Sequence, residues 1–193
     1  MIYYPRENPK SQSKEEKRNM NFRKTTVNDI ARVAEIFDGA RETMHSAGID
    51  QWTDGYPAVS DIQADIDAGV SYVLCEDDGR IVATCAILLD GEVTYTVIAD
   101  GAWLTDTTDD ANTTYVAVHR VATDKTCRGR GLASRLLSEA AAIGRRAGKI
   151  SLRIDTHRDN KPMQGMLARN GLTLCGEITL LSGAKRWAYE KMI

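Results

Sequence analysis

The stretch from Thr114 to Lys149 limits the folds open to this chain more than any other part of it. It begins with an apolar, β-branched run from Tyr115 to Ala122, passes through the polar residues Thr123 to Cys127, and reads Arg128-Gly129-Arg130-Gly131 before an apolar-periodic segment. This order predicts a strand, a turn and a helix. Glycines directly before a helix let backbone N–H groups approach a ligand closely, and the first-turn N–H groups are unpaired and carry the positive end of the helix dipole. We therefore expect an anion site here, with a phosphate or pyrophosphate as its simplest occupant.

The rest of the sequence is typical of one globular domain behind a short tail. Residues 1–20 are polar, rich in Lys, Glu and Ser, and have no apolar period, so we expect a flexible tail, with Met20 as a candidate for the natural start. Residues 21–193 are enough for a single domain with one substantial core.

Composition and charge argue against several classes of partner. The formal net charge of −2 gives no general electrostatic reason to expect nucleic acid or an anionic membrane. No apolar run approaches the roughly 18 residues of a membrane span, and no signal-peptide core follows the N-terminus, so we expect a cytoplasmic protein. The cysteines show neither a CxxC pair nor zinc-like spacing to a histidine, which predicts reduced thiols and no metal site.

The flanking segments predict a sheet of mixed direction with helices on both faces, an α/β or α+β fold. Helices are predicted over residues 30–44, 60–68 and 161–170, the last beginning at Lys161-Pro162 and ending before Gly171. Strands are predicted at residues 71–76, 80–88, 150–154, 172–175, 177–181 and 186–190, with the first two forming a hairpin about Asp77-Asp78-Gly79. Residues 92–98 fit either a strand or a short helical piece, and residues 101–112 a polar loop around Trp103.

Several nucleotide sites combine a strand, a glycine-rich turn and a helix. A P-loop needs Lys-Ser or Lys-Thr directly after its last glycine, and Leu132-Ala133 stands there instead, which excludes it. A dinucleotide-binding turn is compatible with Gly129-Arg130-Gly131 and with Asp155 at the end of the next strand. However, Ser134 occupies the place of its third glycine, and polar residues separate the glycines from the strand, so this site is disfavoured.

A third design matches better. Residues 126–131 resemble the motif Q/R-x-x-G-x-G/A of the acyl-coenzyme A site in the GCN5-related N-acetyltransferase (GNAT) family, with Thr126 departing from the first position. From Asn160 the chain reads Asn-Lys-Pro-Met-Gln-Gly-Met-Leu-Ala-Arg-Asn-Gly-Leu, which is similar to that family's N-x-x-A-x-x-L-Y-x-x-x-G-F. Together the motifs cover roughly Tyr115 to Leu172. The resemblance implies a GNAT-like mixed, mostly antiparallel central sheet of six to seven strands with helices on both faces.

The resemblance also implies acetyl-CoA as co-substrate, no metal, and the residues that hold the cofactor. The pyrophosphate is expected on the backbone amides of Arg128, Gly129, Arg130, Gly131, Leu132 and Ala133. The pantetheine arm is expected to pair with the strand edge formed by Val121, Ala122 and Thr123, whose amide would stabilise the oxyanion, and to accept a hydrogen bond from Asn160. Homodimers are common in the family.

Acyl transfer to an amine needs a group that removes a proton from the nucleophile. His119 is one candidate, because an imidazole has an unperturbed pKa of about 6.5 and strict alternation would place it on the same strand face as Val121 and Thr123. Glu92 is the rival base, acting through water. At the position where the family has a tyrosine that acts as general acid, this chain has Leu167, and leucine cannot protonate a thiolate.

The acceptor is left open by the sequence. Trp52, Tyr56 and Trp103 are candidates for its pocket, since aromatic rings can hold an apolar or cationic amine. We expect an N-acetyltransferase for a small-molecule amine. The alternatives are a non-catalytic acyl-CoA-binding sensor, suggested by Leu167, and a transferase for protein N-termini or lysines.

Overall fold

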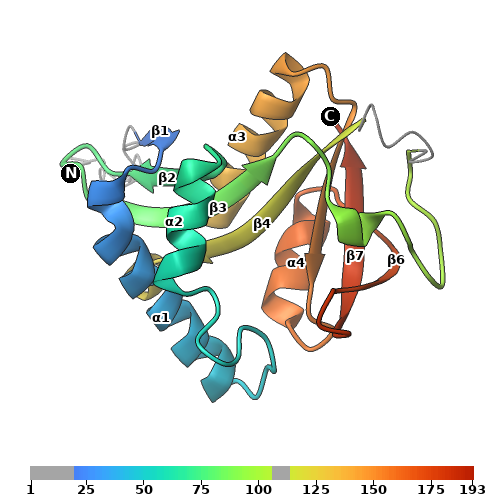
Figure 1. Ribbon diagram of the computed structural model, residues 1–193, viewed down its shortest axis with the longest axis horizontal. Helices are drawn as coiled ribbons and strands as arrows, with labels where there is room; N and C mark the ends of the chain where they lie inside the picture. The colour runs from blue at the N-terminus through green and yellow to red at the C-terminus, as the bar shows by residue number, and fades with distance from the viewer. Residues whose placement is uncertain (1–19, 106–113) are drawn as a thin grey trace, which may run out of the picture.

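The computed structural model describes residues 20–105 and 114–193, which form a seven-stranded mixed sheet covered by helices on both faces (Figure 1). The sheet and its helices confirm the predicted fold class. Residues 1–19 of the predicted tail and residues 106–112 of the polar loop predicted at 101–112 lie outside the described residues.

The sheet is antiparallel except at one central pair. Its strands are β1 (Asn21–Lys24), β2 (Ser71–Cys75), β3 (Ile81–Leu88), β4 (Tyr115–Thr123), β5 (Ser151–Thr156), β6 (Thr173–Thr179) and β7 (Lys185–Met192). They lie in the order β1-β2-β3-β4-β5-β7-β6, and β4 and β5 are the parallel neighbours, connected through α3.

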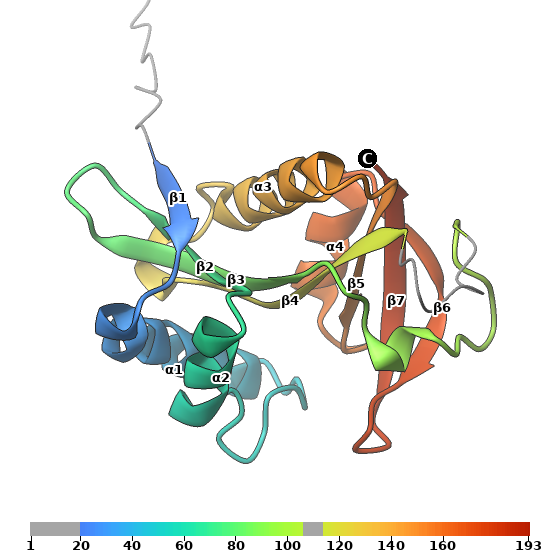
Figure 2. The same ribbon diagram turned by 45° about the horizontal axis from the view of Figure 1, so that its top comes forward.

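Helices cover both faces of the sheet (Figure 2). The helices are α1 (Ile30–Ser46), α2 (Val59–Asp67), α3 (Leu132–Arg146) and α4 (Lys161–Arg169). The apolar side of α1 and α2 packs with β2, β3 and the end of β4, while α3 and α4 pack on the opposite face. Asn160 caps α4, because its Oδ1 accepts a hydrogen bond of 3.1 Å from the Met163 amide, and Pro162 stands in the first turn, where a missing N–H costs little.

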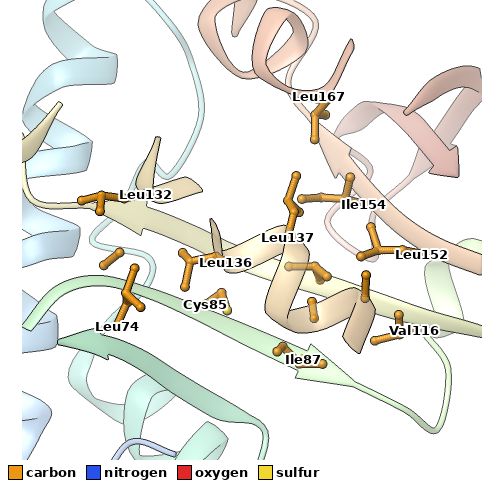
Figure 3. Packing of buried hydrophobic residues seen from close by; sticks show 14 of the residues in the cluster. Leu74, Cys85, Ile87, Val116, Leu132, Leu136, Leu137, Leu152, Ile154 and Leu167 are labelled. Atoms are coloured by element: carbon orange, nitrogen blue, oxygen red, sulfur yellow. The ribbon is translucent and has the colours of Figure 1, made fainter. Parts of the chain in front are cut away.

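The largest core cluster lies between α3, α4 and the sheet (Figure 3). Leu136, Leu137 and Leu167 have no exposed surface there. Leu167 belongs to the same cluster as Leu137 and Ile154, so the residue that replaces the family's tyrosine is a core side chain in this protein.

β4 and β5 separate part of the way along the sheet. Their pairing runs from Tyr115 opposite Ser151 only as far as Ala117 opposite Arg153, whereas β4 continues to Thr123. Figure 1 shows β4 running away from the half of the sheet that contains β7 and β6. The rest of β4 is paired on its β3 side only, which leaves its other backbone edge open to a ligand.

A bulge in β4 corrects the expected alternation. The ladder with β3 shifts between Ala86 opposite His119 and Thr84 opposite Ala122, and Arg120 has a φ angle of 53°. His119 stays on the face of Tyr115 and Ala117, but Val121 packs with the cluster on the α3 face. The prediction that His119 and Val121 share a face was therefore wrong, because the extra residue at the bulge reverses the period of two.

Two element predictions change in the structure. Residues 172–175 and 177–181 were predicted as separate strands, but they form the single strand β6, with a bulge at Gly176. Of the two alternatives for residues 92–98, the helical piece is correct: η2, a 3₁₀ turn, spans Val93–Tyr95, and Ala99 then forms a bridge with Glu177.

Candidate active site

A glycine loop before α3 forms the first part of the site. Gly129 and Gly131 have φ angles of 76° and 72°, a left-handed conformation that glycine adopts readily. Open space lies where a Cβ atom at either glycine would stand. Within the described residues, the amides of Arg128 to Gly131 donate to no acceptor, and the first amides of α3 have no helical partner. The loop thus combines unpaired donors with the positive end of a helix dipole.

The turn before the glycines is held by side chains. Asp124 Oδ1 accepts hydrogen bonds of 2.8 Å from both the amide and the hydroxyl of Thr126. The departure from the motif at Thr126 is therefore compatible with an ordered turn.

The arginines of the loop contact protein groups. Arg130 donates to Glu76 Oε1 at 2.7 Å, and Arg80 donates to Glu76 Oε2 at 2.6 Å; these two cations, Arg130 first, lower the pKa of Glu76 to about 2. Arg128 donates to the hydroxyl of Thr43. The backbone of the loop remains as its free anion-binding group.

A cavity of about 1020 Å³ opens where β4 and β5 separate. Its walls come from α1, the loop between α1 and α2, β4, β5, the start of α4 and the β6–β7 hairpin. Of the residues predicted for the site, those that line the cavity are Trp52, Tyr56, Glu92, His119, Val121 and Asn160. The other predicted site residues do not line it; these are Ala122, Thr123, the loop from Arg128 to Ala133, and Trp103.

His119 lies between two carboxylates in this cavity. Its Nε2 is 3.3 Å from Glu92 Oε2, and its Nδ1 is 3.8 Å from Asp155 Oδ1. The 3.3 Å contact does not have hydrogen-bond geometry, since Nε2 has no hydrogen-bond partner among the described residues. The hydroxyl of Tyr95 donates to Asp155 Oδ1 at 2.7 Å, and the Tyr95 ring lies 5.6 Å from the imidazole. Burial, and then Asp155, raise the pKa of Tyr95 well above its usual value, so this phenol stays protonated and donating.

Glu92 is fixed by the turn that it caps. Its Oε1 accepts hydrogen bonds from the amide of Thr94 at 3.1 Å and from its hydroxyl at 2.9 Å, and its own amide donates to the Tyr115 hydroxyl at 2.9 Å. The neighbouring His119 ring, followed by the Thr94 amide, lowers the pKa of Glu92 to about 2 against an opposing effect of burial. The carboxylate is therefore ionised at neutral pH.

The bulge directs Arg120 toward the loop that holds the predicted aromatics. Arg120 donates two hydrogen bonds to Asp65, of 2.7 and 2.5 Å, and one of 2.7 Å to the Tyr56 hydroxyl. Trp52, in the same loop, contacts Phe37 edge-on, with ring centroids 5.5 Å apart. This loop is thereby tied to β4 and to α1 at the cavity wall.

Asn160 contacts the loop after α1 as well as capping α4. Its Nδ2 donates to Gln51 Oε1 at 2.9 Å. The side chain predicted to contact the cofactor thus also joins the start of α4 to the loop after α1.

Trp103 stabilises the structure behind the site instead of lining it. Its indole Nε1 donates to the Tyr95 carbonyl at 2.9 Å, and its ring covers the buried Arg153 guanidinium at 4.2 Å. The Tyr115 ring covers the other side of that guanidinium at 4.1 Å. The aromatic content of the loop signalled burial here, not substrate contact.

Sequence reasoning missed three contributors to the cavity: Asp155 as a neighbour of His119, Arg120 as an anchor, and Arg186 on β7. The position of Asp155 could have been inferred from the alternation of side chains along β5. Leu152 and Ile154 face the core on one side of the sheet, so Asp155 faces the other side. The other two depend on the bulge and on the β5–β7 register, for which the sequence carries no signal.

Two absences apply to residues 20–105 and 114–193 alone. There, no group of three or more His, Cys, Asp or Glu side chains is suited to a metal ion. In that same part, none of the helices has the length and apolar character needed to cross a bilayer.

Comparison with known proteins identifies the class of this fold and site. The sequence model of the acetyltransferase (GNAT) family matches residues 33–172. A GNAT-family acetyltransferase structure from Streptococcus agalactiae 2603 is 34% identical, with a TM-score of 0.77, over 90% of this chain and 95% of that one. The chain belongs to the GNAT family of acetyltransferases, which are acyltransferases, as the sequence motifs predicted.

More distant structures share the fold. A protein from Salmonella typhimurium, solved with its cofactor acetyl-CoA, is 17% identical over 90% of this chain and 94% of its own, with a TM-score of 0.62. An N-acetyltransferase from Thermoplasma acidophilum in complex with coenzyme A is 13% identical over 91% and 99%, with a TM-score of 0.66. A search among curated proteins found no match.

Proposed function

We propose that this protein transfers the acetyl group of acetyl-CoA to the amine of a small molecule. The observation that carries the proposal is the continuity of the site. His119 and Val121, on the part of β4 beyond its pairing with β5, line one cavity together with Glu92 and Asp155, and the same strand continues to the turn that carries the glycine loop. Relatives solved with acetyl-CoA or CoA share this fold.

The residues present fit the cofactor. The unpaired amides from Arg128 to Ala133 would hold its pyrophosphate, because they are donors at a helix N-terminus. The unpaired backbone edge of β4, which includes Val121 to Thr123, would hold the pantetheine arm as an added strand. When bound, acetyl-CoA supplies the acetyl thioester.

His119 is the better of the two candidate bases. A carboxylate with a pKa of about 2 is a weak proton acceptor, so Glu92 is poorly matched to an ammonium. It is well placed to stabilise the positive charge that His119 acquires on taking a proton, since 3.3 Å separates the two groups. Glu92 thus orients and stabilises the base.

The test compares two histidine variants on a panel of primary amines with acetyl-CoA, measured by thiol release. His119→Ala should lower kcat/KM by roughly 100-fold or more, the usual contribution of a general base. His45→Ala is the control, because His45 is exposed near the end of α1 and does not line the cavity. Equal rates in the two variants would remove His119 from the mechanism.

The same panel separates the alternative functions. Thermal stabilisation by acetyl-CoA without turnover of any amine would indicate a sensor. Turnover of peptide N-termini or lysines, but of no small amine, would indicate a protein transferase. Absence of stabilisation by acetyl-CoA would overturn the cofactor assignment.

A further inference from the structure

We infer that the acceptor is a free amino acid, that is, a small molecule whose carboxylate binds Arg186 while its amine lies at His119. This inference rests on the proposed function and names the substrate class of the same site. It follows from the arrangement of charge on one face of the sheet.

Strand register places Arg186 on the same face as the catalytic groups. Asp155 pairs with Ala188, and Arg186 is two residues from Ala188 along β7, so all three side chains share a face. Arg186 also pairs with Ile178, which belongs to the same buried cluster as Ala188. Diagonal neighbours of this kind lie roughly 7–8 Å apart.

Arg186 lacks a counter-charge within residues 20–105 and 114–193. Its one hydrogen bond in the described part of the chain is from Nη1 to the carbonyl of Lys185 at 2.9 Å, and no described acid pairs with it. It lines the cavity. A half-buried guanidinium with free donors is suited to bidentate binding of a carboxylate.

The adjacent Lys185 shows the contrast. It belongs to the opposite face, with Glu177 and Trp187, and its Nζ donates to Glu177 Oε1 at 2.5 Å. Arg158 donates to the same carboxylate at 3.0 Å. All three cations line the cavity, but Lys185 and Arg158 are compensated by Glu177, whereas no described acid pairs with Arg186.

The opposite end of the acceptor site suits a cation. Glu92 is ionised at neutral pH, and Asp155 Oδ1 lies beside His119. These two carboxyl groups are therefore suited to bind an ammonium group. Ala188, a buried residue, stands between Asp155 and Arg186 on this sheet face, while Asp155 and Arg186 both line the cavity. An acceptor with its ammonium at Glu92 and Asp155 and its carboxylate at Arg186 matches both ends.

The experiment uses matched acceptor pairs: leucine against 3-methylbutylamine, and phenylalanine against 2-phenylethylamine. The corresponding amino acid amides are analogues of equal size that keep the amine but lack the carboxylate charge. Wild type should favour the amino acids in kcat/KM by at least about 10-fold, as expected for one charge-assisted contact. Arg186→Gln should lower kcat/KM for the amino acids by roughly 10- to 100-fold and leave the values for the plain amines within about twofold.

Lys185→Gln is the control, because it removes the same charge one residue away, at a cavity-lining position whose cation is already paired with Glu177, and it should retain the preference. Turnover of the plain amines without preference for the acids would overturn this inference while leaving the proposed function intact. A preference that survives Arg186→Gln, or that Lys185→Gln abolishes equally, would also overturn it. Lack of turnover with every compound would instead count against the proposed function.

Discussion

Removing the charge of Glu190 tests how much the buried ion pair between Arg153 and Glu190 contributes to the stability of the fold. Arg153 and Glu190 are paired at 2.9 Å with fully buried side chains. Glu190 also accepts hydrogen bonds of 2.5 Å from the hydroxyls of Thr105 and Ser151. Glu190→Gln keeps the size of the side chain but leaves the Arg153 guanidinium without its counter-charge.

The cost follows from burial. Breaking a buried ion pair by removing one partner costs about 3–5 kcal/mol, because an uncompensated charge stays out of water. For a domain of this length each kcal/mol lowers Tm by about 2–4 °C, which predicts a fall of roughly 6–20 °C. Circular dichroism melting, with urea unfolding for the free energy, measures both quantities.

An exposed pair supplies the control. Lys125 and Glu42 are 2.7 Å apart with side chains 57% and 66% exposed, so Glu42→Gln should leave Tm unchanged within error. Arg153→Met combined with Glu190→Met should recover much of the stability lost in either single variant, because no unpaired charge remains. If Glu190→Gln and Glu42→Gln have the same Tm, the buried pair of Arg153 and Glu190 does not contribute the stability assigned to it.

Two further predictions concern the site. In the folded protein the pKa of Glu92 is about 2, whereas in the unfolded chain this carboxylate takes up its proton near the ordinary value of 4.5, so the stability of the protein should fall as the pH drops from about 4.5 toward 2. Urea midpoints measured between about pH 5 and 2.5 should therefore fall less steeply in Glu92→Gln than in the wild type. An identical slope in the two proteins would contradict the lowered pKa of Glu92. Leu167→Tyr, which restores the family's tyrosine, should lower stability by about 1–3 kcal/mol through overpacking of a fully buried site and give no gain in kcat; a faster enzyme would show that a tyrosine there can reach the leaving group.

Local patterns sufficed for the elements and for the cofactor loop. The left-handed glycines before α3 were predictable because Gly129 and Gly131 stand between a polar turn and an apolar-periodic helix. The β2–β3 hairpin followed from Asp77-Asp78-Gly79, where Gly79 has a φ angle of 85°. In these cases the residue types alone carry the conformation.

Features that depend on distant contacts were not predictable. Gly176 was interpreted as a break between strands, whereas β6 continues through it as a bulge, with the Ala99 carbonyl close to where its Cβ would be. The bulge at Arg120 contains no glycine, so the local sequence contained no indication that His119 and Val121 would face opposite sides of the sheet. Trp103 was assigned to the acceptor pocket because the sequence does not show that its ring covers Arg153.

Charged side chains follow one another in layers on one face of the sheet. In the first layer β5 and β7 present Arg153 and Glu190, whose side chains are fully buried and pair with each other. In the next layer Asp155 stands opposite the buried Ala188 and lines the cavity. One layer further, beyond the end of the β5–β7 pairing, Arg186 also lines the cavity. The same alternation therefore places a compensated ion pair in the interior and, two layers away on the same face, a guanidinium for which no described acid is a partner.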